Sequence, residues 1–142
     1  MWFSPLLPGG AQLQSGAAAI TRPNSDITVT GWVGDPDNVN LYANIDEVTP
    51  SDTDFIISPD LGSTPGPAIF GISPTLSTGS FDVRFRASRT GTSGQIRVLL
   101  QDSGGSTVGT SAWQNLTASA AQYTLNVTTS GSATRVRLEV QA

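Results

Sequence analysis

The chain has 142 residues, of which 37% are hydrophobic and only 13% are charged, and it contains 15 glycines and 9 prolines. This length suits one domain with a single core, and the composition favours short strands joined by tight turns over long helices. The formal net charge of −4 argues against nucleic acid or an anionic membrane as the main partner, because both bind basic surfaces.

Cysteine, histidine and lysine are absent, so that all seven basic residues are arginine. Without cysteine there is no disulfide framework and no thiolate metal site. Without histidine the commonest general base and metal ligand is missing, and without lysine there is no Schiff-base chemistry. We therefore expect no enzymatic activity, no cofactor and no bound metal.

Residues 1–19 differ in character from the rest of the chain. Pro5, Pro8 and the Gly9-Gly10 pair oppose regular structure here, and no basic residue precedes the apolar part, as a secretory signal peptide would require. We predict an N-terminal arm that either docks onto another molecule or folds back over its own domain. Its anchors, the candidate intermolecular contacts, are Trp2, Phe3, Leu6 and Leu7.

From residue 20 to residue 142 the sequence predicts one domain made of successive strands. Apolar and polar residues alternate in most of them, and turn residues recur at the short spacing of an antiparallel sandwich. The predicted strands are residues 27–33, 41–45, 55–57, 67–73, 81–87, 95–101, 107–113, 123–127 and 136–140, with a hairpin turn at 103–106. The predicted fold is all-β, an antiparallel two-sheet β-sandwich of the jelly-roll type.

Charge is distributed unevenly along the chain. The stretch from Pro23 to Val83 contains nine acidic residues and no lysine or arginine, whereas six arginines follow it. The two stretches either neutralise each other across the sandwich or form complementary faces for side-by-side assembly. The arginines at outward strand positions form a candidate charged contact face: Arg84, Arg86, Arg97, Arg135 and Arg137.

Acidic residues crowd three short segments, Asp35-Pro36-Asp37, Asp46-Glu47 and Asp52-Thr53-Asp54. Such carboxylates can supply the oxygen ligands of a calcium site or the acid and base of a glycosidase. They are also common in turns, where they accept hydrogen bonds from backbone N–H groups. Because no segment has EF-hand spacing and nothing sets a separation between two carboxylates, we expect turns.

Four aromatic residues suggest either a sugar-binding platform or core packing. Trp32, Trp113, Tyr42 and Tyr123 are the candidates. Tyr123 falls on the inward face of its strand by alternation, and large aromatic side chains usually fill or seal a core. We expect Trp32 and Trp113 in the core.

Several segments resemble, in their order and spacing, β-sandwich modules of structural proteins from tailed bacteriophages and prophages. They begin with residues 22–26, RPNSD, and the Gly31-Trp32 pair, and the most recognisable one is LYANIDE at residues 41–47. Further matches are VRFRA at 83–87, IRVLLQ at 96–101, Trp113 with Leu116-Thr117, YTL at 123–125, and RVRLE at 135–139. The resemblance implies association with a virion rather than a chemical activity.

A separate domain with a short arm suits a particle-surface protein made in many copies. We therefore expect a capsid cement, or decoration, protein that is made in the bacterial cytoplasm and located on the virion. Its expected partners are the major capsid protein and further copies of itself, with a trimer favoured. The alternatives are a carbohydrate-binding or host-attachment module on the virion surface, and a tail-associated structural protein.

Overall fold

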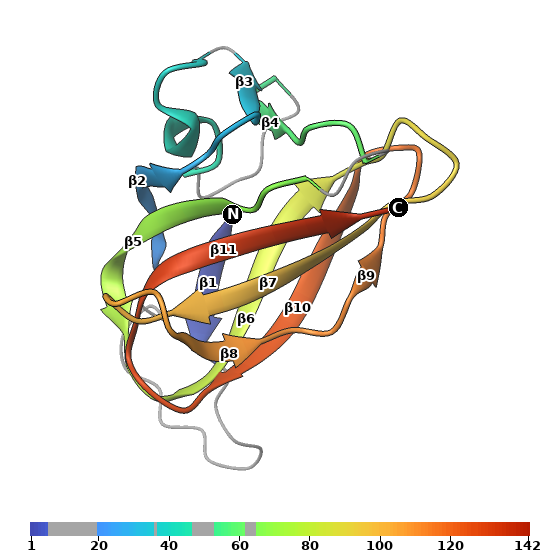
Figure 1. Cartoon of the computed structure of the whole chain (residues 1–142). Helices are drawn as coiled ribbons and strands as arrows, with labels where there is room; N and C mark the ends of the chain where they lie inside the picture. The colour runs from blue at the N-terminus through green and yellow to red at the C-terminus, as the bar shows by residue number, and fades with distance from the viewer. Residues whose placement is uncertain (6–19, 36, 47–52, 62–64) are drawn as a thin grey trace.

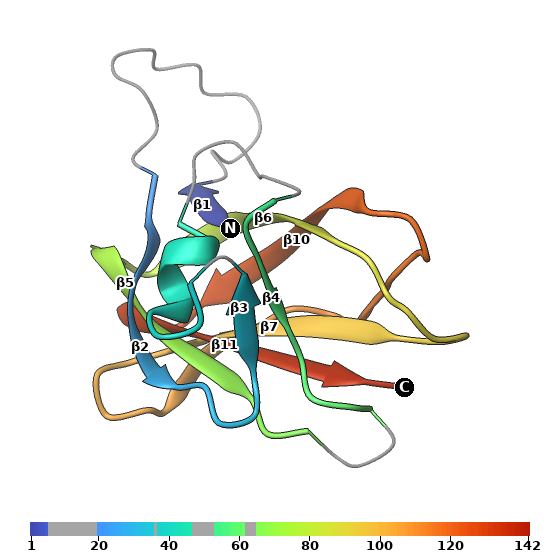
Figure 2. The same cartoon turned by 90° about the horizontal axis from the view of Figure 1, so that it is seen from above.

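The computed structural model describes residues 1–5, 20–35, 37–46, 53–61 and 65–142, with the backbone alone for residues 2–5. The chain folds into two facing antiparallel sheets, which we call A and B, and a small two-stranded sheet C. Figures 1 and 2 show the two main layers from two directions, with sheet C and one short helix at one end. The predicted all-β sandwich is confirmed.

Sheet A has three strands and sheet B has a path of five. The order in sheet A is β1 (Trp2–Pro5), β6 (Gly79–Ala87) and β10 (Ala121–Thr129). The order in sheet B is β2 (Arg22–Thr28), β5 (Ala68–Leu76), β11 (Ala133–Gln141), β7 (Gln95–Gln101) and β8 (Thr107–Thr110), with β9 (Gln114–Asn115) also paired to β7. Sheet C consists of β3 (Val33–Asp35) and β4 (Phe55–Ile57).

Strands that follow one another in sequence often lie in opposite sheets. β5 continues through a two-residue turn into β6, and β10 continues through another short turn into β11, so each pair crosses from one sheet to the other. β10 pairs with β6, and β11 pairs with β5. These crossings join the two layers of the antiparallel sandwich, whereas the predicted jelly-roll type stays a prediction.

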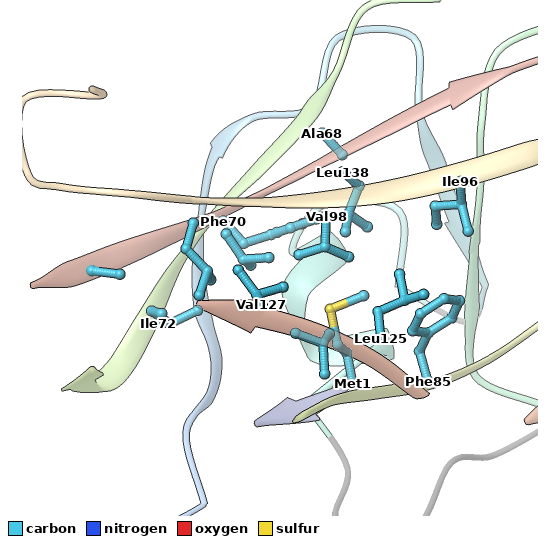
Figure 3. Close-up of a cluster of buried hydrophobic side chains, with 14 of the residues drawn as sticks. Met1, Ala68, Phe70, Ile72, Phe85, Ile96, Val98, Leu125, Val127 and Leu138 are labelled. Atoms are coloured by element: carbon cyan, nitrogen blue, oxygen red, sulfur yellow. The ribbon is translucent and has the colours of Figure 1, made fainter. Parts of the chain in front are cut away.

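The core lies between the inward faces of sheets A and B. Alternate residues of β6, β7, β10 and β11 are buried, and Figure 3 shows side chains from both sheets meeting in one apolar layer. The predicted inward faces are confirmed for β5, β6 and β7, with these residues at most 7% exposed: Ala68, Phe70, Ile72, Phe81, Val83, Phe85, Ile96, Val98 and Leu100.

The predicted strand at residues 27–33 is wrong in its middle. β2 ends at Thr28 and β3 begins at Val33, and between them the Trp32 N–H donates to the Val29 carbonyl at 3.0 Å. Gly31 in this turn has φ = 80°, a conformation that is open to glycine and strained for other residues. Alternation alone did not reveal the turn.

The predicted strand at residues 41–45 is a 3₁₀ helix, η1 (Leu41–Asn44). The Asp26 carboxylate of β2 accepts the backbone N–H groups of Leu41 and Tyr42, each at 2.8 Å. A tertiary contact from 15 residues away therefore satisfies the first donors of the helix.

Among the described residues, no helix has the length and apolar character needed to span a bilayer.

The first five residues belong to the sandwich, contrary to the expectation that prolines exclude regular structure there. β1 forms the edge of sheet A, with Trp2 opposite Arg84 and Pro5 opposite Phe81. Proline is tolerated at such a place because an edge strand does not need every N–H for the ladder. Met1 is 7% exposed, its side chain points into the core (Figure 3), and its amino group donates to the Ile45 carbonyl at 2.6 Å.

Phe70→Ala should lower the free energy of unfolding by about 3–5 kcal/mol, because it leaves a cavity where a fully buried ring was. Urea unfolding followed by tryptophan fluorescence measures this change. Thr124→Ala, at an exposed position of β10, is the control and should change stability by about 0.5 kcal/mol or less. A small effect of Phe70→Ala would place this ring outside the core.

Candidate interaction surfaces

Sheet C exposes an apolar surface at one end of the sandwich. Val33 is 42% exposed, Phe55 38% and Ile57 50%. Val33 lies opposite Ile57, and Asp35 lies opposite Phe55, so these four side chains share one face of the sheet. We call this face, made of Val33, Asp35, Phe55 and Ile57, the apolar ledge.

The opposite face of sheet C holds the ledge against the domain. Ile56 lies on that face and packs against the core, and Gly34 lies opposite it. A Cβ atom at Gly34 would collide with the Asp37 carbonyl and the Asn44 side chain, so only glycine fits. The buried Asn44 amide bonds the Asp37 backbone twice, accepting at 3.2 Å and donating at 2.5 Å. The loop behind the ledge is thus tightly held.

Asp37, close to the ledge, serves as a local acceptor, as expected for a turn. Asp37 Oδ1 accepts the N–H groups of Val39 at 2.7 Å and Asn40 at 3.0 Å. These bonds, first that from Asn40 and then that from Val39, stabilise the carboxylate and lower the pKa of Asp37. Within the described ranges, no group of three acidic side chains is placed to hold a metal ion; Glu47 and Asp52 lie outside them.

The predicted arginine face is divided between the two sheets. Arg84 and Arg86 lie on β6 in sheet A, whereas Arg97 lies on β7 and Arg135 and Arg137 lie on β11 in sheet B. All five side chains point away from the core, as the alternation predicted. A stripe of all five would have required neighbouring strands, and the five arginines do not share one face, because alternation sets the side of a strand and not the sheet that contains it.

The outer face of sheet B contains a network of charged and aromatic side chains. Glu139 binds the Arg97 guanidinium through Oε2 and the Arg137 guanidinium through Oε1, each at 2.6 Å. Arg97 lies over the Trp113 ring, 4.6 Å from its centroid, in a cation–π contact. Arg135 donates to the Ser103 carbonyl, and among the described residues no carboxylate pairs with it.

The four aromatic candidates do not form a common platform. Trp32 is 7% exposed and donates to the Gly66 carbonyl at 2.9 Å, which confirms its predicted core position. Trp113 lies on the outer face of sheet B, so its predicted core position is wrong. Tyr123 stacks on Phe85 with ring centroids 5.6 Å apart, and Tyr42 is half-buried against the core.

The predicted arm contacts are only partly described. The backbone of Trp2 and Phe3 pairs with β6 of the same chain, which is the second of the two alternatives for this segment. Leu6 and Leu7 lie outside the described residues, as does the rest of the stretch up to residue 19. The division of the chain between residues 19 and 20 therefore stays a prediction.

Comparison of the chain with protein-family models, with curated proteins and with solved structures gave no match. The resemblance to virion modules therefore stays a prediction. The apolar ledge was not predicted as a site, although Phe55-Ile56-Ile57 provided a signal: three consecutive large apolar residues in a strand cannot all face one core.

Asp37→Ala should lower the melting temperature at neutral pH and have little effect in acid. The pKa of Asp37 is lower in the folded chain than in the unfolded one, so its stabilisation is complete above the ordinary value of about 3.9 and is lost as the pH falls through the lowered value. Calorimetry of both proteins across this range measures the difference. Asp37→Asn is a further comparison, because it keeps an acceptor oxygen that does not titrate. A difference in melting temperature between the unmodified chain and Asp37→Ala that persists in strong acid would contradict this cause.

Glu139→Gln should lower the free energy of unfolding by about 1 kcal/mol, because it leaves two neighbouring guanidinium groups without their shared carboxylate. Asp82→Asn is the matched control: its side chain is also 17% exposed, but its single pair to Arg84 is longer, at 3.3 Å. We expect about 0.5 kcal/mol or less there. Urea unfolding at low salt and in about 1 M NaCl measures both, and equal losses would contradict a network.

Proposed function

We propose that this protein is a structural component of a bacteriophage particle, a capsid cement protein that binds and stabilises the assembled head. The virion part of the proposal rests on the resemblance of residues 22–139 to phage sandwich modules. The binding part is supported by one observation above all, the exposed apolar ledge. We assign the chain no chemical reaction and no cofactor.

The ledge has the properties of a contact surface. Three large apolar side chains lie together on one face of sheet C and are exposed to water. Ile56 packs β4 onto the core, and Asn44 bonds the Asp37 backbone just after β3. Little ordering of the ledge is therefore needed when a partner binds. The surrounding chain is acidic, which favours a partner surface that combines apolar groups with positive charge.

Cement activity follows from such a surface by mass action. A protein that binds only the assembled lattice lowers the free energy of that lattice and so opposes disassembly. Many copies, each with a modest contact, add their effects over the particle. This mechanism requires a rigid domain with outward contacts and no active site.

The alternative of a carbohydrate-binding module receives no support from the aromatic side chains. The Trp32 ring is buried, and the one described face contact of Trp113 is with Arg97. A tail-associated structural protein needs the same kind of surface as a cement protein, so the two differ only in their place on the particle.

Antibody labelling of intact particles tests the location. We expect gold-labelled antibody against this chain to decorate the heads of the phage whose genome encodes it, and heads lacking the protein to release their DNA at a lower temperature. Labelling confined to the tail, or particles without label, would overturn the assignment. Added purified chain should restore the stability of the deficient heads.

A further inference from the structure

Two surfaces of the domain carry charges without an opposite partner among the described residues. Asp35, on the apolar ledge, is exposed and its carboxylate has no described cation beside it; Arg135, on the outer face of sheet B, has no described carboxylate. We propose that the apolar ledge of one copy binds the outer face of sheet B on a second copy. The inference rests on the proposed function only in treating the ledge as a contact surface.

The composition of the ledge disfavours a symmetric contact between the ledges of two copies. Val33, Phe55 and Ile57 would pack well against their own copies, but Asp35 lies on the same face. A two-fold contact would therefore bury both Asp35 carboxylates, and the stretch from Pro23 to Val83 has no lysine or arginine to compensate. The ledge requires a partner that is apolar and positively charged.

The outer face of sheet B has this combination. It presents three arginines, Arg97, Arg135 and Arg137, against the single carboxylate of Glu139. Trp113 packs against Arg97, and Leu99, opposite Arg137 at an outward position of β7, is apolar but only 8% exposed. Tryptophan and arginine are the residues most enriched at the centres of protein interfaces.

The outer face of sheet A suits the ledge less well. On β6, Arg84 is paired with Asp82 and Arg86 leaves one positive charge in excess, whereas the three arginines and Glu139 of sheet B leave two. The outward residues of β10 beside it are uncharged and polar: Gln122, Thr124, Asn126 and Thr128. Among the described side chains, sheet B therefore offers the greater positive excess.

The positions of the two surfaces allow a chain of contacts. The ledge lies at one end of the sandwich, and the outer face of sheet B lies along its side, as Figures 1 and 2 show. One copy can therefore bind a neighbour through each surface at once. Such a head-to-tail contact either closes into a ring or continues as an open helical filament, and both place copies side by side.

A mixing experiment with two complementary variants tests the proposal. Asp35→Arg spoils the ledge and leaves sheet B intact, whereas Arg135→Glu spoils sheet B and leaves the ledge intact. In sedimentation velocity the unmodified chain should self-associate, and each variant alone should stay monomeric, with its dissociation constant raised about tenfold or more. An equimolar mixture should associate again, because the intact ledge of the Arg135→Glu variant can bind the intact sheet B face of the Asp35→Arg variant.

Other outcomes overturn the inference. A mixture that stays monomeric, an unmodified chain that stays monomeric at high concentration, or an Asp35→Arg variant that associates more strongly would exclude the head-to-tail contact. Phe55→Thr removes apolar surface without changing charge and should weaken association similarly. Gln122→Glu, on the outer face of sheet A, is the control and should leave association unchanged. Thermal unfolding of each variant checks that it is folded.

The experiment separates this inference from the proposed function. Head labelling without self-association would leave the cement assignment intact and overturn the contact between copies. Self-association with the predicted variant pattern but without labelled heads would support the contact between copies and overturn the cement assignment. Weakening of the association in about 1 M NaCl, where the Debye length is about 3 Å, is expected because opposite charges contribute to it.

Discussion

Burial of the inward faces of sheets A and B against each other is the interaction on which the rest of the structure depends. Phe70, Val98, Val127 and Val136 are fully buried between the layers, and each large side chain of this kind contributes about 1.5–3 kcal/mol when it leaves water. Because alternate residues are used in this way, the others must face outward. The arginines of β6, β7 and β11 are therefore on the surface as a consequence of the core.

The end of the sandwich obeys a different constraint. The strands of sheet C are only three residues long, and a single side chain, Ile56, packs from β4 onto the core. Its neighbours on either side, Phe55 and Ile57, then have to point outward, although they are apolar. Hydrogen bonds hold this end in place, notably those of Asp26 to η1 and of Asn44 to the Asp37 backbone. The exposed apolar surface is thus a product of local pairing, and we interpret it as the site of contact.

The separation of charge along the chain becomes a separation in space. The acidic half of the sequence builds the end of the domain that carries the ledge, where carboxylates of Asp26 and Asp37 are engaged by backbone N–H groups. The arginine-rich half builds most of the two layers, with Glu139 neutralising part of the charge on sheet B. The domain therefore has one acidic, apolar end and a net positive outer face on sheet B.

The sequence by itself determined the features that depend on short-range pattern: the all-β class, the inward faces of β5, β6 and β7, the 103–106 hairpin and the use of aspartates in turns. It did not determine which sheet each strand joins, so the five arginines were considered as one candidate face. Nor did it determine that Trp113 packs against Arg97 outside the core. The turn at Gly31 was also missed. So was the 3₁₀ helix at Leu41–Asn44, because its first N–H groups are bound by the distant Asp26 carboxylate. The run Phe55-Ile56-Ile57 indicates that some apolar side chain must face outward, but only the tertiary structure decides that Ile56 meets the core while Phe55 and Ile57 are exposed.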